Sequence, residues 1–491
     1  MGKKNGKNNN QNAADKNGGI HDARTLGVPR MLILGLQHMF AMFGATILVP
    51  MITGLDVSTT LLMAGLGTLL FHVLTKFKVP AFLGSSFAFL GGYAAVKAMA
   101  PEGADPTTML PYACLGVAAA GLVYLVLALI VKSMGVERMM KFFPPVVTGP
   151  IIIAIGLDLA PSAINNCVTN WTLALIALLV IIIFNIWGKG MMKIIPIILG
   201  LIVSYGIGLG LYYIAQANPA LIQDYPWLFS GGAELDAAGN VVKYLPIFDF
   251  KTLEEVISNI GQGHIFGDNC LLALPIHWDK TVFGGVDWSN GMLILSSIIA
   301  IIPISLASMM EHIGDISAIG STVGKNFIKD PGLHRTLTGD GLATTMASLF
   351  GGPANTTYGE NTGVLVLTKV YDPRVIRIAA CFAVGASFFP VVSARIGTIP
   401  ASIIGGISLV LYGMISSIGV RNLVENKVDF TKSRNLIIAA IILVCALGLG
   451  DDTVSFPVGS AQITLSPLAV ASIAGVLLNA ILPGKDYKFK K

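Results

Sequence analysis

The sequence contains little charge. Asp, Glu, Lys and Arg make up 12% of its 491 residues, about half of the roughly 25% found in a typical soluble domain. Apolar residues reach 54% and gather in runs such as 171–187 and 194–214, each near the roughly 20 residues with which a helix crosses a bilayer. The composition therefore excludes an ordinary soluble protein. Because each membrane span must satisfy its own backbone hydrogen bonds, as a helix does, we predict an all-α polytopic membrane protein.

Signatures of enzymes and metal sites are also scarce. The chain has five cysteines without metal-ligand spacing, and it shows no nucleophile-triad spacing and no phosphate-binding loop. We therefore expect no enzyme activity, no cofactor and no bound metal. Cys167 and Cys270 both fall on the outer side of the topology given below, where a disulfide between them is one alternative and two free thiols are the other.

The first 30 residues are polar and basic, and no apolar stretch follows them closely enough for a cleaved signal peptide. We interpret residues 1–30 as a disordered cytoplasmic tail and residues 485–491 as a second cytoplasmic tail. A long outer segment at 215–289 is expected to be a small extracellular cap or an irregular loop. The remaining chain holds fourteen candidate spans: 31–52, 57–75, 81–97, 108–131, 143–160, 170–187, 191–214, 290–315, 335–351, 356–370, 375–393, 399–419, 434–450 and 462–483.

The positive charges predict which side each loop is on. With the N-terminus inside and the loops alternating, 27 of the 32 Lys and Arg residues fall on the inner side, as expected when cytoplasmic loops carry the excess of basic residues. We therefore predict a multi-pass protein of the cell membrane with both termini in the cytoplasm. Since the basic residues do not cluster on one soluble face, nucleic acid is not an expected partner.

Two of the fourteen segments are poor spans. The third begins at Pro80 and the tenth at Pro353, and both are short. Proline prevents a helix from continuing on its N-terminal side, so we predict that each span is discontinuous, with a short extended segment before a half-helix. Because three and ten differ by seven, we predict a 7+7 inverted repeat, in which interrupted spans at matching positions mark a transporter's substrate site. Re-entrant loops of purely structural purpose are the alternative.

Carboxylates occur where an apolar span should exclude them. Glu311 and Asp315 are four residues apart and share one helix face, and Glu360 lies at the start of the tenth half-helix. We predict a polar site in which one carboxylate binds substrate donors and another exchanges a proton. For Asp315, an exit of the helix into the cytoplasm is an equal alternative.

Three further polar residues are expected in the interior. His38 and His312 lie inside spans, and we predict that they pack or hydrogen-bond within the core. We expect Asp340 to be a hydrogen-bond partner in helix packing, with a second proton-linked group as the alternative.

Four segments, 36–50, 80–89, 329–352 and 355–380, closely resemble the nucleobase–cation symporter family, also called nucleobase–ascorbate transporters, and within it the bacterial uracil permease branch. The resemblance implies fourteen spans. Spans 1–4 and 8–11 would form a core domain at 31–133 and 290–393, and spans 5–7 and 12–14 a gate domain at 134–214 and 394–484. Family members are often dimers and bacterial ones are proton symporters, so a homodimer and a proton as coupling ion are implied, with sodium as the alternative ion.

The resemblance also implies a substrate site between the third and tenth spans. It would contain two substrate-binding carboxylates, a ring that stacks on the base, two residues that offer backbone groups, and two tyrosines near the core–gate boundary: Glu311 and Glu360, Phe87, Gly359 and Ala45, and Tyr358 and Tyr412. The candidates for proton coupling are Glu311, Asp315 and Glu360.

The sequence departs from this family at Asp315, where uracil permeases often have His. A carboxylate can also take up a proton, but its charge when deprotonated is opposite to that of a protonated His, so the coupling chemistry stays open. Glu360 stands where purine-specific relatives commonly have Gln. We therefore predict a proton-coupled importer of uracil or a close pyrimidine. A xanthine or uric acid carrier is the alternative, and an inverted-repeat anion transporter is a more distant one.

Overall fold

A computed structural model describes residues 19–101, 103–139, 141–236, 240–449, 454–458 and 461–484. The described residues are mostly helical. Their first half forms η1 (Ala23–Leu26), α1 (Val28–Thr53), α2 (Val57–Leu74), β1 (Leu83–Ser85), η2 (Phe87–Phe89), α3 (Leu90–Lys97), η3 (Pro106–Met109), α4 (Leu110–Met134), α5 (Val136–Met139), α6 (Pro145–Asp158), α7 (Ala160–Val168), α8 (Trp171–Trp187), α9 (Met191–Ile194), α10 (Pro196–Ala217), α11 (Ala220–Asp224), α12 (Pro226–Phe229), β2 (Ser230–Leu235), β3 (Val241–Pro246), α13 (Lys251–Gly261), η4 (Trp278–Lys280) and α14 (Val282–Gly285).

The second half begins with α15 (Gly291–Ile301) and α16 (Ile304–Val323). It continues with the π-helical turn η5 (Ile328–Gly332), α17 (Leu333–Leu349), β4 (Asn355–Thr357), α18 (Gly359–Thr368), α19 (Pro373–Ser387), α20 (Pro390–Gly397), α21 (Ala401–Glu425), α22 (Ser433–Gly448), β5 (Val454–Val458), β6 (Ala461–Leu465) and α23 (Pro467–Ile481). Many of these helices begin at a proline, because the first turn leaves its N–H groups unpaired in any case.

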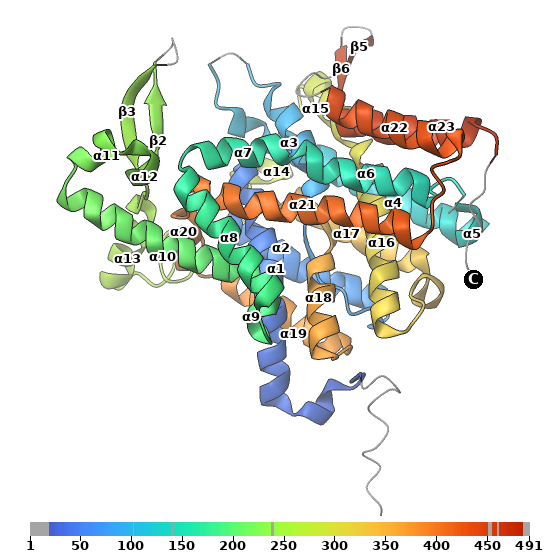
Figure 1. Ribbon diagram of the computed structural model, residues 1–491, viewed down its shortest axis with the longest axis horizontal. Helices are drawn as coiled ribbons and strands as arrows, with labels where there is room; N and C mark the ends of the chain where they lie inside the picture. The colour runs from blue at the N-terminus through green and yellow to red at the C-terminus, as the bar shows by residue number, and fades with distance from the viewer. Residues whose placement is uncertain are drawn as a thin grey trace, which may run out of the picture.

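The helices fall into two sets that pack mainly among themselves (Figure 1). In one set, α17 packs on α4 and α2, and α19 packs on α2 and α1. In the other, α21 packs on α6, α7 and α8, and α22 packs on α23 and α6. Contacts of α16 with α6 and α23, and of α1 with α10, join the two sets.

Glycines allow two of the helix pairs to approach closely. A Cβ atom added at Gly121 of α4 would lie 2.7 Å from the carbonyl oxygen of Gly341 of α17, and one added at Gly341 would lie 2.6 Å from that of Gly121. Gly149 of α6 and Gly419 of α21 face each other in the same way. A Cβ atom added at Gly149 would lie 3.2 Å from the carbonyl oxygen of Gly419, and one added at Gly419 would lie 2.6 Å from that of Gly149. Small residues at such contacts are typical of helices that pack within a membrane.

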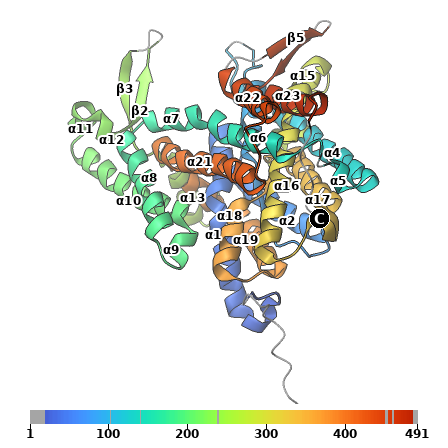
Figure 2. The ribbon, with the colours of Figure 1, turned by 45° about the vertical axis from the view of Figure 1, so that its right-hand side comes forward.

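Three pairs of strands interrupt the helices in the described part of the chain. β1 and β4 pair antiparallel although 272 residues separate the partners Gly84 and Thr356. β2 pairs with β3, and β5 with β6, as local hairpins. Both hairpins extend from one side of the molecule, and the N-terminal segment lies at the opposite side (Figures 1 and 2).

Seven of the helical stretches are long and apolar enough to cross a membrane, and the bent pair α19–α20 can count as an eighth. Three shorter apolar helices, α8, α22 and α23, add to these. Two expected spans have the wrong shape. The eighth was expected to end at 315 but is interrupted at Pro303 and continues to Val323. The eleventh, expected to be continuous over 375–393, bends by 84° where Pro390 begins a new helix, because proline cannot extend the preceding hydrogen-bond ladder.

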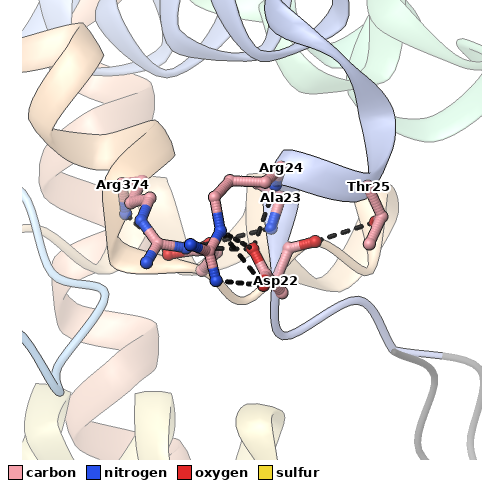
Figure 3. A network of polar contacts seen from close by, with 6 residues as sticks. Asp22, Ala23, Arg24, Thr25 and Arg374 are labelled. Atoms are coloured by element: carbon pink, nitrogen blue, oxygen red, sulfur yellow. Dashed lines mark hydrogen bonds and ion pairs between the residues drawn. The ribbon is translucent and has the colours of Figure 1, made fainter. Parts of the chain in front are cut away.

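The N-terminal tail is shorter than expected, because residues 20–26 are docked on the rest of the chain. Ile20 forms a bridge with Val370, and the backbone N–H of Ala23 donates to Asp372 Oδ2 at 2.7 Å. Arg374 donates to Asp22 Oδ1 at 2.9 Å, and Arg24 donates to the same carboxylate (Figure 3). The side-chain hydrogen bond from Arg24 lowers the pKa of Asp22 to about 2. The expected disorder over 1–30 therefore fails from residue 20 onward, and residues 1–18 lie outside the described part.

The outer segment at 215–289 is a structured cap containing β2, β3 and α13. The two cysteines for which a disulfide was considered are both free. Cys167 ends α7 and packs against Gly405 of α21, whereas Cys270 lies in the cap close to Gly267. The two thiols lie in different parts of the fold, and the structure supports the alternative in which both are free.

Candidate functional site

The β1–β4 pair is the centre of the candidate site. Prolines precede both strands, and each strand leads directly into a helix: β1 into η2 and α3, and β4 into α18. Two further hydrogen bonds extend the pairing, from Ser86 N to Ala354 O at 2.8 Å and from Tyr358 N to Phe82 O at 3.0 Å. α18 begins without a side-chain cap, so the N–H groups of its first turn are of the kind that a helix start leaves available for other acceptors.

A small cavity of about 20 Å³ lies beside this pair. Its wall combines polar residues of β1, β4 and α16 with apolar residues of α6 and α21: Ser85, Phe87, Ile152, Glu311, Asp315, Thr356, Thr357, Tyr358, Gly359, Ile415 and Ile418. Sites for small molecules generally measure roughly 300 Å³ or more, and this cavity is far smaller.

Asp315 lines the cavity. Its side chain is buried, and Thr357 Oγ1 donates to Asp315 Oδ2 at 3.2 Å. α16 continues for two further turns to Val323, so the helix does not end at Asp315. A role of Asp315 in proton exchange stays a prediction.

Behind Asp315 lies a second polar layer. His312 Nδ1 is 3.4 Å from Thr357 Oγ1 and 3.3 Å from Asp340 Oδ2, and both His312 and Asp340 are completely buried. The pair joins α16 to α17, as expected for a core histidine and a helix-packing carboxylate. Asp315, Thr357, His312 and Asp340 therefore form a continuous row of polar contacts from the cavity into the helix packing.

The carboxylates at the site are not equally described. Glu311 is half-buried and lines the cavity one helical turn before Asp315. Glu360 is the second residue of α18, but its side chain lies outside the described part of the structure. The predicted pairing of Glu311 with Glu360 across the substrate therefore stays a prediction.

The three aromatic residues have different positions. Phe87 lines the cavity and meets Tyr412 of α21 edge-on, with ring centroids 5.8 Å apart. Tyr412 is 1% exposed and is not among the lining residues. Tyr358 lines the cavity, but its hydroxyl donates to Ser85 O at 2.9 Å and lies 3.4 Å from Thr46 Oγ1. It thereby braces β1 against the start of α18.

Of the remaining predicted residues, Gly359 lines the cavity, whereas Ala45 and His38 are buried in α1. Gly359 lines the cavity, and a Cβ atom there would lie 3.5 Å from Asp315 Oδ1. Ala45 is completely buried in α1 and is not part of the described wall of the cavity. Its neighbour Thr46 contacts the site instead, since the carbonyl oxygen of Thr46 accepts from Ser85 Oγ at 3.1 Å. His38 is completely buried in α1, and its carbonyl accepts from Asn361 of α18 at 3.5 Å.

A larger cavity of about 750 Å³ adjoins the small one. It lies between α6, α16, α18 and α21 and extends to the segment that joins α21 to α22. The two cavities share four wall residues, Ile152, Asp315, Gly359 and Ile418. These four residues therefore form the partition between the small cavity and an open vestibule.

Sequence reasoning missed the apolar half of the wall. Ile152, Ile415 and Ile418 are isoleucines within apolar helices, and no feature of the residues distinguishes them from isoleucines that face lipid. Ser85, Thr356 and Thr357 carried a signal, because polar pairs after a proline are unusual in a span. The extended segments they belong to are thus the part of the site that the sequence could indicate.

Long apolar helices, two crossed strand–helix units and a polar cavity between two helix sets define a multi-pass membrane protein built for solute passage. The comparisons with known proteins give the family. The Permease family model, Xan_ur_permease, matches residues 29–454, and the chain belongs to this family, the nucleobase–ascorbate transporters, whose members are permeases and not enzymes. The resemblance found in the sequence is confirmed.

Two relatives and one solved structure illustrate the likeness. The chain is 37% identical over 477 residues to a uracil permease of Bacillus caldolyticus, covering 95% of this chain and 94% of the relative. It is 36% identical over 461 residues to the uracil permease of Bacillus subtilis, covering 91% of each. The transmembrane domain of the cyanobacterial bicarbonate transporter BicA matches with a TM-score of 0.53 at 17% identity, over 88% of this chain and 98% of that one, which shows a shared fold alone.

Proposed function

We propose that the protein imports uracil, or a close pyrimidine base, by proton symport across the cytoplasmic membrane. The observation that carries the proposal is the cavity at the β1–β4 pair, where Glu311 and Asp315 face an aromatic ring and the uncapped start of α18. Relatives named uracil permeases cover almost the whole chain. Both observations support a nucleobase as the solute.

The wall chemistry suits a planar base with mixed polarity. Uracil carries two ring N–H donors and two carbonyl acceptors on a flat ring. Carboxylates such as Glu311 and Glu360 can accept from the N–H groups, N–H groups at the start of α18 can donate to a carbonyl, and Phe87 can cover one face of the ring. Gly359 leaves room for the base to approach the backbone.

We assign proton coupling to the carboxylates. Among them, Asp315 occupies the position at which the resemblance leads us to expect His, and we propose that it takes up the proton. It lies in the partition between the small cavity and the vestibule, so it can meet both substrate and water. Protonation removes the charge of Asp315 while the site is loaded, and loss of the proton toward the vestibule restores a negative charge beside the substrate, which favours release.

The transport cycle follows from the proposed architecture of fourteen spans in a 7+7 inverted repeat. In it, β1 with α3 and β4 with α18 are the discontinuous third and tenth spans, and the core at 31–133 and 290–393 moves against the gate at 134–214 and 394–484. The packing of the helices in two sets supports this division. The vestibule reaches the loop between α21 and α22. If this loop is cytoplasmic, as the distribution of basic residues predicts, the small cavity is a contracted site in an inward-facing state. Association into a homodimer is part of the proposal.

A xanthine or uric acid carrier of the same family is the second candidate, since those bases contain a uracil-like ring that the same wall chemistry can hold. An anion transporter is disfavoured, because Glu311 and Asp315 would repel a bare anion. Binding of uracil, thymine, cytosine, xanthine and uric acid to the purified protein, measured across pH, tests the assignment. We expect uracil to bind most tightly and with a pH dependence; xanthine binding more tightly than uracil would overturn it.

A further inference from the structure

The outer segment 218–289 has two parts that are attached to different helix sets. The first part, 218–248, contains α11, α12 and the β2–β3 hairpin, and the second, 251–289, contains α13, η4 and α14. Figure 1 shows the hairpin with α11 and α12 beside α8 and α10, and α13 close to α20. We call these parts the gate foot and the core foot.

The gate foot is bound to α8 and α10. Asn170, which caps α8, donates to the carbonyl oxygens of Leu228 at 3.1 Å and Ser230 at 2.8 Å. At the other end of this foot, the buried ring of Phe248 meets Tyr205 of α10 edge-on, with centroids 4.8 Å apart. These contacts fix both ends of the hairpin unit on the gate helices.

The core foot is bound to α2, α4 and the end of α19. The N–H of Ala273 donates to Phe388 O at 3.0 Å, and the N–H of Asp287 donates to Tyr112 Oη of α4 at 3.0 Å. Thr59 of α2 donates to the carbonyl of Pro275. A relative motion of the two helix sets must therefore carry the two feet in different directions.

The joint between the feet is short and aromatic. Phe248 and Phe250 stack with centroids 5.3 Å apart and planes 5° apart, and Phe250 also meets Tyr212 of α10 edge-on at 5.5 Å. On its other side, Phe250 packs against a small cluster in which Leu253 of α13 contacts Ala394 of α20. Phe250 is thus the point at which the chain passes from the gate foot to the core foot.

The second outer connection between the helix sets runs through α20, which links α19 to α21 after the 84° bend. α13 packs directly on α20. The outer segment 218–289 and the α20 connection are therefore in contact with each other. A displacement of the core cannot be absorbed in one connection without moving the other.

We infer that residues 218–289 are a tether between core and gate, and that movement of Phe250 away from Tyr212 is a required step of the transport cycle. The inference rests on the proposed function, because it needs a core that moves against a gate. Two rigid feet joined at one hinge are typical of elements that guide domain motion, in which a few residues absorb the change.

The test joins Tyr212 to Phe250 in a Tyr212→Cys/Phe250→Cys variant, using a short bifunctional methanethiosulfonate that reductant reverses. The matched control joins Ala233→Cys to Tyr244→Cys, which face each other across β2 and β3 within the gate foot. Uracil uptake in proteoliposomes and uracil binding to the same protein are both measured, before cross-linking, after it and after reduction.

We expect cross-linking at Tyr212–Phe250 to lower uptake by about tenfold or more while binding stays within about twofold, since a conformational step then limits turnover, and we expect reduction to restore uptake. The control cross-link should leave uptake unchanged. Undiminished uptake in the cross-linked Tyr212–Phe250 variant would overturn the tether. Failure of the proposed function is distinct, because the protein without any cross-link would then neither bind nor take up uracil.

Discussion

The hydroxyl of Thr357 lies 3.2 Å from Asp315 Oδ2, and this contact ties the extended strand β4 to α16. It places the buried carboxylate of Asp315 in direct contact with the strand pair that forms the site. The same hydroxyl lies 3.4 Å from His312 Nδ1. A change of charge at Asp315 therefore alters the hydrogen bonding of Thr357 and, through it, of His312. The coupling chemistry of this protein is therefore expected to depend on an aspartate and a threonine.

Asp315→Asn should separate binding from coupling. The amide keeps an oxygen that can accept from Thr357 but it cannot ionise, so we expect uracil affinity to stay within about tenfold, a change of the size of one hydrogen bond. Accumulation driven by a proton gradient should be lost. Uptake measured with the gradient and after its collapse checks this, and Asp315→Glu, which keeps the titratable group, is the control. Normal gradient-driven uptake in the Asn variant would show that Asp315 is not part of the coupling.

Thr357→Val should shift the pH profile of uptake. The change keeps the shape of the side chain but removes the donor to Asp315, and loss of a buried hydrogen bond costs about 1–3 kcal/mol. The carboxylate of Asp315 loses this donor, so the pH profile of uptake should differ from that of the unchanged protein. The matched control is Thr356→Val, because Thr356 is equally buried and its hydroxyl has no partner within the described residues. Equal profiles for the two variants would contradict the assignment.

Ile418→Ala should relax selectivity for single-ring bases. Ile418 lies in the partition between cavity and vestibule, and its truncation widens the passage next to Gly359. We expect xanthine to compete with uracil about tenfold better or more, because a single methylene in an apolar pocket already changes discrimination by about tenfold and this change removes three carbon atoms. Ile418→Leu keeps the volume and should compete as the wild type does. Competition by excess xanthine during uracil uptake measures the difference.

Asp22→Asn should release the docked N-terminal segment. The neutral side chain loses its ion pairs with Arg24 and Arg374, so the N–H of Ile20, which donates to Lys369 O at 2.7 Å, should exchange faster with deuterium. Arg421→Gln, which removes a distant surface pair with Glu425, should not change this exchange. Equal protection of Ile20 in all three proteins would contradict the role given to the network.

The pH range of this docking follows from the same carboxylate. The pKa of Asp22 is lowered from 3.8 to about 2, so its contribution is fully present above 3.8 and is lost as the pH falls through about 2. Protection of Ile20, after correction for the intrinsic exchange rate, should therefore be the same throughout the neutral range. Loss of protection between pH 7 and 5 would assign the docking to another group.

Much of the fold was predictable because apolar runs and prolines act locally. Pro80 and Pro353 each precede an extended segment and a short helix, as expected from the inability of proline to continue a helix. Pro390 carried the same signal, but the expected span 375–393 runs across it, so the bend was not predicted. The pairing of β1 with β4 was not predicted. The matching positions of the two interrupted spans placed both at one site, but no local feature connects strands so far apart in sequence.

The site was predictable mainly on its polar side; on the apolar side the resemblance supplied Phe87 but none of the three isoleucines. Glu311 and Asp315 stand out because a carboxylate in an apolar helix needs a reason, and both line the cavity. Ala45 and Tyr412 came from the resemblance and lie behind the described wall, where Thr46 and Phe87 make the nearer contacts. Ile418 has no distinguishing feature in the sequence, and its place follows from how α21 packs against the core.

The most direct test of proton-coupled uracil import is the uptake of labelled uracil into proteoliposomes containing the purified protein, with an inward proton gradient and with an uncoupler. We expect accumulation above equilibrium that requires the gradient, that collapses with the uncoupler, and that falls when Glu311→Gln removes the first carboxylate of the site. Uptake that is indifferent to the gradient and to the uncoupler would contradict proton symport, and no uptake of uracil under either condition would contradict the assigned substrate.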